Sequence, residues 1–287
     1  MNKLIKLFTL VCFMFCLSGC FKEDVLSNDN VYTTIYPIKY LTDVLYGDTK
    51  TIASIYPNGA NVSKYELTKK QKEVYSLGSL FVYNGITTEK ELAREFLKKN
   101  KNILLIDASY NLKYDTDIEE LWLSPNNYLM LAKNIKNNLI EYTTSKVTKE
   151  SIEKNFKELE ERLSYMDADL RSIATSAANE GSTLIVTSSS KLNFLKKYGF
   201  EVLNLSNSSI NENTIKSNFK NENYKDIYLC STDQKTALIT DLETNYGANV
   251  IIVNTMETLT DNEVANKENY ETIMNNFIEN IRNTTLS

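Results

Sequence analysis

The sequence of 287 residues contains no histidine. This absence excludes the Ser-His-Asp and Cys-His relays of hydrolases, the HExxH zinc helix and any metal cage built from imidazole. Basic side chains number 32 against 37 acidic ones, so the formal net charge of −5 gives no electrostatic reason to expect a nucleic-acid partner. Hydrophobic residues make up 42% and charged residues 24%, which is typical of a folded globular protein with one large domain or two.

Cysteine is scarce, and most of it lies near the start of the chain, where residues 1–20 have the character of a secretory signal. Lys3 and Lys6 precede an apolar run at 7–17 that is too short to span a bilayer. The run ends in Leu17-Ser18-Gly19-Cys20, which resembles a bacterial lipobox. We therefore expect residues 1–19 to be a lipoprotein signal peptide and an acylated Cys20 to anchor the protein outside the cytoplasm, on the bacterial cell membrane. An ordinary secretory cleavage site is the alternative.

If the lipobox is processed, it also determines which cysteines remain in the mature chain. Cys12 and Cys16 leave with the signal and Cys20 is acylated, so only Cys230 remains and no internal disulfide is expected. Cys230 ends an apolar run, and we interpret it as a small core residue rather than a ligand. Residues 20–30 are expected to form a tether between the membrane and the folded part.

Strand-like and helix-like stretches alternate from residue 31 onward, which predicts parallel sheets covered by helices. Four predicted strands precede the most regular segment of the chain and four follow it, at 31–36, 51–56, 80–84, 103–106, 183–187, 201–205, 226–230 and 249–253. We therefore predict an α/β fold of two lobes, 31–147 and 180–287, each a roughly four-stranded parallel sheet flanked by helices.

One long rigid helix, predicted at 148–179, joins the two lobes. Its apolar residues recur alternately four and three positions apart between Ile152 and Ile173. Such a stripe is typical of a coiled-coil dimer, and equally of a helix that packs across two lobes. We favour the second interpretation and expect a monomer.

Ligands of doubly wound sheets bind beyond the carboxyl ends of the strands, so a site is expected in the loops that follow them. Seven motifs in these loops and strands, in this order, resemble the zinc- and manganese-type solute-binding lipoproteins of bacterial ABC importers. They are VYTTIYP at 31–37, PNGANVSKYEL at 57–67, LFVYNG at 80–85, IDAS at 106–109, ELWLSP at 120–125, TSSSKLNFLKKYGF at 187–200 and NYGANVIIVNT at 245–255. The resemblance implies a receptor, not an enzyme, that presents a solute held between its lobes to an ABC permease.

The resemblance also implies where a divalent ion would bind. The family uses three histidines, or two and a carboxylate, plus one further acid, and these positions fall on Ser63, Glu120, Ser189 and Asn254. Only Glu120 keeps a charge, so it is the one candidate metal ligand. One carboxylate and three neutral oxygens make a poor zinc site and suit Mn²⁺, Mg²⁺ or Ca²⁺ better. Tight zinc binding is therefore not expected, whereas binding of another divalent metal is compatible with these residues.

The sequence is also compatible with other ligands in the cleft. Asp107, Glu119 and Asp233 would add charge for a cation if they face the cleft. Alternatively, hydroxyls and amides would line a polar pocket for a small organic solute or anion; these are Ser63, Ser189, Ser190 and Asn254.

Two functions other than transport are compatible with parts of the sequence. Ser188-x-x-Lys191 matches the S-x-x-K motif of acylating serine enzymes, but no KTG or SDN partner accompanies it, so no catalytic residue is expected. A surface scaffold, adhesin or accessory lipoprotein descended from the transport family is the alternative to a receptor.

Overall fold

The computed structural model describes residues 30–47 and 51–286. The predicted signal peptide, the lipobox with Cys20 and all of the predicted tether except Asn30 lie outside these described residues. Within the described ranges, no helix combines the length and the apolar character needed to cross a membrane.

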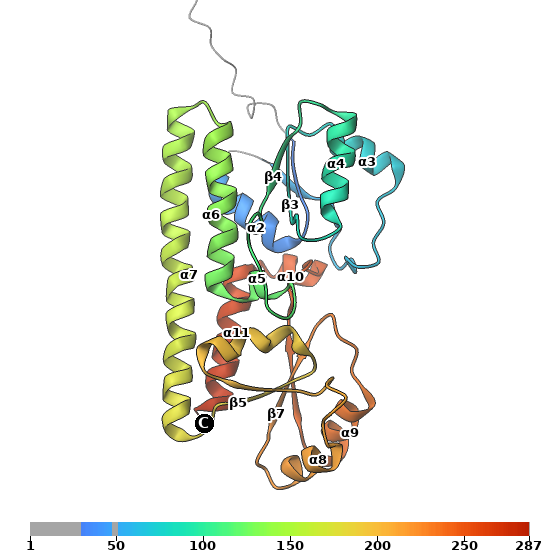
Figure 1. Ribbon diagram of the computed structural model, residues 1–287, viewed down its shortest axis with the longest axis vertical. Coiled ribbons are helices and arrows are strands. Elements are labelled where there is room, and N and C mark those ends of the chain that lie inside the picture. The colour runs from blue at the N-terminus through green and yellow to red at the C-terminus, as the bar shows by residue number, and fades with distance from the viewer. Residues whose placement is uncertain (1–29, 48–50, 287) are drawn as a thin grey trace, which may run out of the picture.

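Two four-stranded sheets of identical topology form the two lobes (Figure 1). The first sheet has the order β2-β1-β3-β4 and the second the order β6-β5-β7-β8, and all neighbouring strands are parallel. The strands are β1 (Val31–Thr33), β2 (Ile52–Ser54), β3 (Leu80–Tyr83), β4 (Leu104–Asp107), β5 (Leu184–Thr187), β6 (Glu201–Asn204), β7 (Asp226–Cys230) and β8 (Asn249–Val253). The predicted fold class is confirmed.

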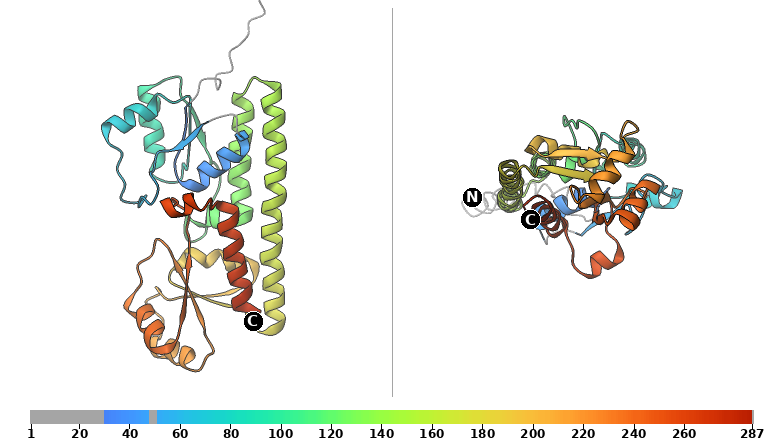
Figure 2. Two further views of the ribbon diagram at one scale, coloured as in Figure 1. Left: turned by 180° about the vertical axis from the view of Figure 1, so that it is seen from behind. Right: turned by 90° about the horizontal axis from the view of Figure 1, so that it is seen from below.

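Helices cover both sheets, and three long ones form a wall along one side of the molecule (Figures 1 and 2). The wall consists of α6 (Pro125–Tyr142), α7 (Lys146–Glu180) and α11 (Tyr270–Thr285). The other helices are α2 (Tyr36–Tyr46), α3 (Lys69–Ser76), α4 (Glu89–Lys99), α5 (Glu120–Leu123), the 3₁₀-helix η2 (Ser190–Tyr198), α8 (Glu212–Lys220), α9 (Ala237–Tyr246) and α10 (Asp261–Ala265).

The first strand is shorter than predicted. Strand β1 ends at Thr33, and Tyr36, which the β-branched run places in a strand, is the first residue of α2. Pro37 lies in the first turn of α2, where its fixed φ suits a helix and its missing N–H leaves no bond unmade. The proline therefore outweighs the strand propensity of the residues just before it.

Helix α7 is the long helix that joins the lobes, and its 35 residues make it about 50 Å long. It begins after Ser145, whose side chain accepts a hydrogen bond from the Thr148 N–H, and it ends at Gly181 in the left-handed conformation. Its apolar stripe from Ile152 to Ile173 is buried against α2, α6 and α11 of the same chain. The stripe is thus used inside the molecule, as the two-lobe interpretation predicts.

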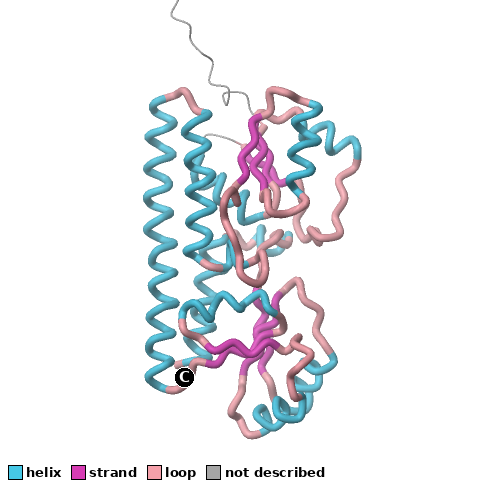
Figure 3. The backbone as a smooth tube through the Cα atoms, in the orientation of Figure 1, coloured by secondary structure: helices cyan, strands magenta, loops and turns pink. Residues whose placement is uncertain are grey.

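The lobes also contact each other directly. Loops of both lobes meet between the two sheets (Figure 3), where the Gly59 N–H donates to the Leu259 carbonyl over 2.9 Å. The Trp122 indole of the first lobe donates to the Thr255 carbonyl of the second over 2.7 Å. Tyr270 in turn donates to the Trp122 carbonyl over 2.7 Å, and one hydrophobic cluster runs from β1 to α11. The core is therefore continuous across the lobe boundary.

Candidate functional site

A cavity of about 910 Å³ lies beside the loops where the lobes meet. Seven carboxylates line it, against a single ammonium, that of Lys72, which is itself paired with one of them, Glu95, at 2.8 Å. The seven are Glu66, Glu89, Glu91, Glu95, Asp117, Glu119 and Glu257. Aromatic side chains complete the wall, namely Tyr56, Tyr65, Tyr114 and Trp122. A cavity of this size with excess negative charge suits a positively charged solute larger than a bare ion.

Glu89 is the most deeply buried carboxyl of this cavity, with 3% of its surface exposed. It stands at the start of α4, where its Oε2 accepts a hydrogen bond from the Asn84 N–H at 2.8 Å. The pKa of Glu89 is raised to about 7. Burial is the main cause, and the nearby carboxylates Asp107 and Glu257 contribute, whereas the hydrogen bond from the Asn84 N–H lowers the pKa. Glu89 therefore changes protonation near neutral pH.

Two other cavity carboxyls have raised pKa values for the same main reason. Burial raises the pKa of Glu119, and Asp117 and Asp233 add to the rise while the Lys191 ammonium opposes it. Burial also raises the pKa of Glu257, to which the charge of Glu119 contributes. Crowded, partly desolvated carboxylates of this kind gain from any cation that enters.

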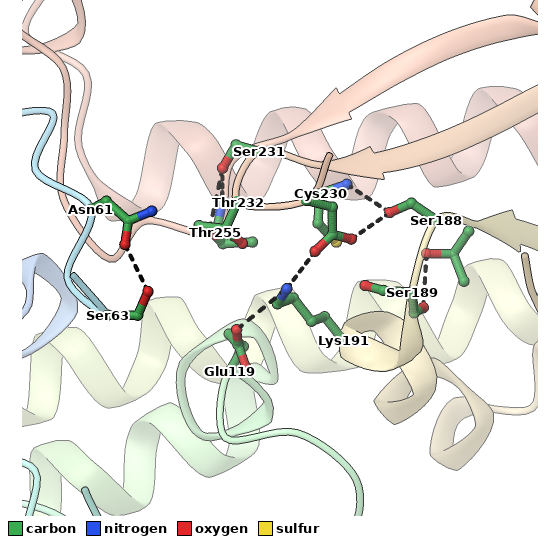
Figure 4. Close-up of polar contacts among 12 residues, drawn as sticks. Asn61, Ser63, Glu119, Ser188, Ser189, Lys191, Cys230, Ser231, Thr232 and Thr255 are labelled. Carbon is green, nitrogen blue, oxygen red and sulfur yellow. Dashed lines mark hydrogen bonds and ion pairs between the residues drawn. The ribbon is translucent and has the colours of Figure 1, made fainter. Parts of the chain in front are cut away.

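Between the lobes lies an ion pair built around Lys191 (Figure 4). Its Nζ, on η2 of the second lobe, is 2.5 Å from Asp233 Oδ1 and 3.8 Å from Oε1 of Glu119 in the first lobe. The three side chains are only 18%, 13% and 8% exposed, in the order Lys191, Asp233, Glu119. An ammonium thus joins a carboxylate of each lobe away from bulk water.

Lys191 and Asp233 each stabilise the charged form of the other. Burial alone would lower the pKa of Lys191, but the hydrogen bond and charge of Asp233 and the charge of Glu119 outweigh it and raise the pKa. Burial opposes ionisation of Asp233 too, yet hydrogen bonds from Lys191 and from the Ser188 hydroxyl hold its pKa below the ordinary value. The charged forms of both partners are therefore favoured at neutral pH.

The four positions implied by the family resemblance do not all line one cavity. Ser63 is exposed at the large cavity and donates to Asn61 Oδ1 over 2.7 Å. Asn254 lines a second cavity of about 330 Å³, and its Oδ1 accepts from the Met256 N–H at 2.8 Å. Ser189 is half-buried beside Asp233 and Cys230.

Glu120, the candidate metal ligand, is bound by residues of its own surroundings. Its carboxylate forms an ion pair with Lys197 and accepts hydrogen bonds from the Asn127 amide at 3.2 Å and the Asp115 N–H at 3.1 Å. Both oxygens of Glu120 are thus engaged by the protein, and 2% of its surface is exposed. The adjacent Glu119 lines the cavity instead, because consecutive residues at the start of α5 point in different directions.

Other candidates have structural roles. Asp107 Oδ1 accepts hydrogen bonds from the Gly85 N–H at 2.9 Å and from the N–H and hydroxyl of Ser109 at 3.0 and 2.9 Å, so it fixes two loops together. Cys230 is buried as expected, and burial raises the pKa of its thiol to about 12. Across residues 30–47 and 51–286, no group of three or more acidic or cysteine side chains is arranged to hold a metal ion.

The S-x-x-K motif is not arranged for catalysis. Ser188 donates to Asp233 Oδ2 over 2.6 Å, and its oxygen accepts from the Cys230 N–H at 3.1 Å. A general base must be deprotonated, and the charged Lys191 is held by two carboxylates. The pair therefore forms part of an electrostatic network.

Sequence reasoning did not identify Glu89, Glu257 or the ion-pairing role of Lys191. Glu89 follows the Asn84-Gly85 strand end by a few residues, and this spacing is a weak sign of a carboxylate near the sheet edge. Glu257 and Lys191 carried no such sign, because their partners lie far away in the chain; Lys191 and Asp233 are 42 residues apart.

Comparison with known proteins places these observations in a family. The family model for the periplasmic component A of zinc-uptake complexes matches residues 31–284. The zinc-binding lipoprotein AdcA of Streptococcus pneumoniae serotype 4 is 22% identical over 313 residues, covering 99% of this chain and 61% of that protein. The manganese ABC transporter substrate-binding lipoprotein PsaA of Streptococcus anginosus is 26% identical over 213 residues, covering 68% of each chain. This chain thus spans about three fifths of the length of AdcA.

Solved structures show the same fold. The metal-dependent lipoprotein YcdH from Bacillus subtilis superposes with a TM-score of 0.75 at 24% identity, covering 91% of this chain and 100% of that chain. The Zn(II)-bound ZnuA-like domain of Streptococcus pneumoniae AdcA has a TM-score of 0.73 at 21% identity, again covering 91% of this chain and 100% of that chain. At these identities the likeness establishes the two-lobed architecture.

Proposed function

Since this chain belongs to the family of periplasmic zinc-uptake component A proteins, we propose that it is the extracytoplasmic solute-binding protein of a metal-type ABC importer. Relatives named as manganese and iron ABC transporter substrate-binding lipoproteins support this role. In this proposal the acylated Cys20 anchors a monomer to the membrane, and an ABC permease receives the solute. No nucleic acid takes part, and no reaction is catalysed.

The solute of this receptor is a small organic cation rather than a tightly held zinc ion. The observation that carries this assignment is the cavity of about 910 Å³, whose seven acidic side chains outnumber the cations that pair with them. Glu91, Glu95 and Glu119 form ion pairs with Arg94, Lys72 and Lys191, and the other four acidic side chains form none with a described residue. The aromatic walls of this cavity, including Tyr65 and Trp122, would attract a cationic head group through their π-faces. A zinc site would need nitrogen or sulfur ligands, which the positions Ser63, Ser189 and Asn254 do not supply.

Thermal unfolding and calorimetry of the mature chain test this function. The ligand panel holds putrescine, choline and arginine as organic cations, glycine and glutamate as controls, and Zn²⁺, Mn²⁺, Fe²⁺ and Ca²⁺. We expect saturable binding and a higher melting temperature with at least one organic cation and with none of the control amino acids. Submicromolar zinc affinity would refute the assignment, and no stabilisation across the panel would favour a scaffold or adhesin.

Two substitutions test whether the organic cation binds in this cavity. Glu257→Gln removes one cavity charge and should weaken binding of the organic cation about three- to tenfold, as expected for a single partly screened charge. The matched control is Glu73→Gln on α3, which removes an exposed carboxylate that does not line the cavity. Equal effects of the two substitutions would show that binding depends on overall charge and not on this cavity.

A further inference from the structure

The ion pair of Lys191 joins the two lobes where their loops meet. Glu119 precedes α5 of the first lobe, whereas Lys191 and Asp233 follow β5 and β7 of the second. Ser188 adds a hydroxyl to the same network by donating to the other oxygen of Asp233, Oδ2, over 2.6 Å. Two carboxylates from opposite lobes thus have one cation between them, and that cation is part of the protein.

We propose that Lys191 is the resident cation of this inter-lobe site: its ammonium links Glu119 to Asp233, holds the lobes together without a bound ion, and excludes divalent metals. This inference does not depend on which solute enters the large cavity. The ammonium adds an electrostatic contact to the shared core of the lobes, in a chain whose described part contains no group of three acidic or cysteine residues arranged for a metal.

The charge arrangement supports exclusion of a metal. Glu119 and Asp233, with the hydroxyl of Ser188, are hard oxygen donors of the kind that Mn²⁺ and Ca²⁺ bind. A divalent ion would have to displace an ammonium that is covalently tethered at the site and therefore present at high effective concentration. It would also leave a partly buried ammonium without its counter-ions, which is unfavourable.

Helix η2 binds the 115–120 segment of the first lobe at a second point. Lys197, at the other end of η2, forms ion pairs with Glu120 and, at 2.9 Å, with Asp115. Two lysines of one helix therefore hold one segment of the opposite lobe. This second link means that removal of Lys191 should open the metal site without separating the lobes.

The test is a gain of metal binding in Lys191→Met, which removes the ammonium and keeps an unbranched side chain only one atom shorter. Calorimetry and thermal unfolding with Mn²⁺ and Ca²⁺ are compared with those of the wild-type chain. We expect at least tenfold tighter Mn²⁺ binding by Lys191→Met. The matched control Lys196→Met, an exposed lysine of η2, and the charge-retaining Lys191→Arg should both behave like the wild type.

A second substitution identifies the ligands. Adding Asp233→Asn to Lys191→Met should abolish the gain, because one of the two carboxylates is then neutral. Wild-type Mn²⁺ binding as tight as that of Lys191→Met would overturn the proposal, as would a folded Lys191→Met chain with no gain. If that variant does not fold, Lys191→Gln is measured with the same two outcomes. Organic-cation binding by the wild type is measured separately, so failure of either proposal is recognised on its own.

Discussion

Glu89 should make the stability of this protein fall as the pH rises toward neutrality. Its carboxyl is 3% exposed, and burial raises its pKa from 4.5 to about 7. In the unfolded chain the same group ionises near its ordinary value, so between these two pKa values the folded state binds the extra proton. Stability from this group is therefore fully present below pH 4.5 and is lost as the pH rises through 7.

The magnitude follows from the size of the shift. One pKa unit corresponds to about 1.4 kcal/mol, so a rise from 4.5 to about 7 corresponds to about 3 kcal/mol of stability lost between pH 4 and pH 8. Glu89→Gln removes the ionisation and keeps an oxygen that can accept the Asn84 N–H hydrogen bond. The variant should thus be about 1–3 kcal/mol more stable than the wild type at pH 8 and no more stable at pH 5.

Urea unfolding of both chains at half-unit steps from pH 5 to pH 8 measures this difference. Glu91→Gln, an exposed carboxylate on the same helix, is the control and should leave the pH dependence unchanged. Parallel stability curves for the wild type and Glu89→Gln would refute the reasoning, since they would show that Glu89 ionises alike in the folded and unfolded chains.

Three further substitutions test the packing that positions the site. Gly85→Ala should destabilise the chain by about 1–3 kcal/mol in urea unfolding, because its Cβ would lie 1.9 Å from Asp107 Oδ2; combined with Asp107→Ala the effects should be less than additive. Trp122→Phe should cost about 1–3 kcal/mol by leaving the buried Thr255 carbonyl without its donor, and an unchanged melting temperature would contradict this. Leu159→Ala, fully buried on α7, should cost about 2–5 kcal/mol, and a loss below 1 kcal/mol would show that the stripe is not core.

Local patterns in the sequence predicted most of the architecture. Alternating strand-like and helix-like stretches, and an apolar stripe from Ile152 to Ile173, are properties of short segments, so they can be read without knowing how the segments pack. Pro37 shows the limit of such patterns, because this one residue makes β1 end earlier and α2 begin earlier than the strand-like run at 31–36 predicts. The stripe itself is compatible with packing within the chain or between chains, and the sequence favoured packing within the chain.

The identity of the site residues depended on tertiary structure. Glu119 and Glu120 are adjacent and chemically alike, and only the orientation of α5 places one at the cavity and the other against Lys197. Lys191 stood out only within a catalytic motif, since its partner Asp233 is brought to it by the neighbouring strands β5 and β7. Contacts between distant residues of this kind are set by how the elements pack.

The sequence by itself determined that this protein has no histidine, and therefore that no imidazole can ligate a metal between its lobes. The tertiary structure decided what stands there instead, a lysine ammonium between a carboxylate of each lobe, next to an acidic cavity. The physical reason is that composition limits which chemical groups exist, whereas charge pairing and desolvation depend on which groups the fold brings within a few ångströms of one another.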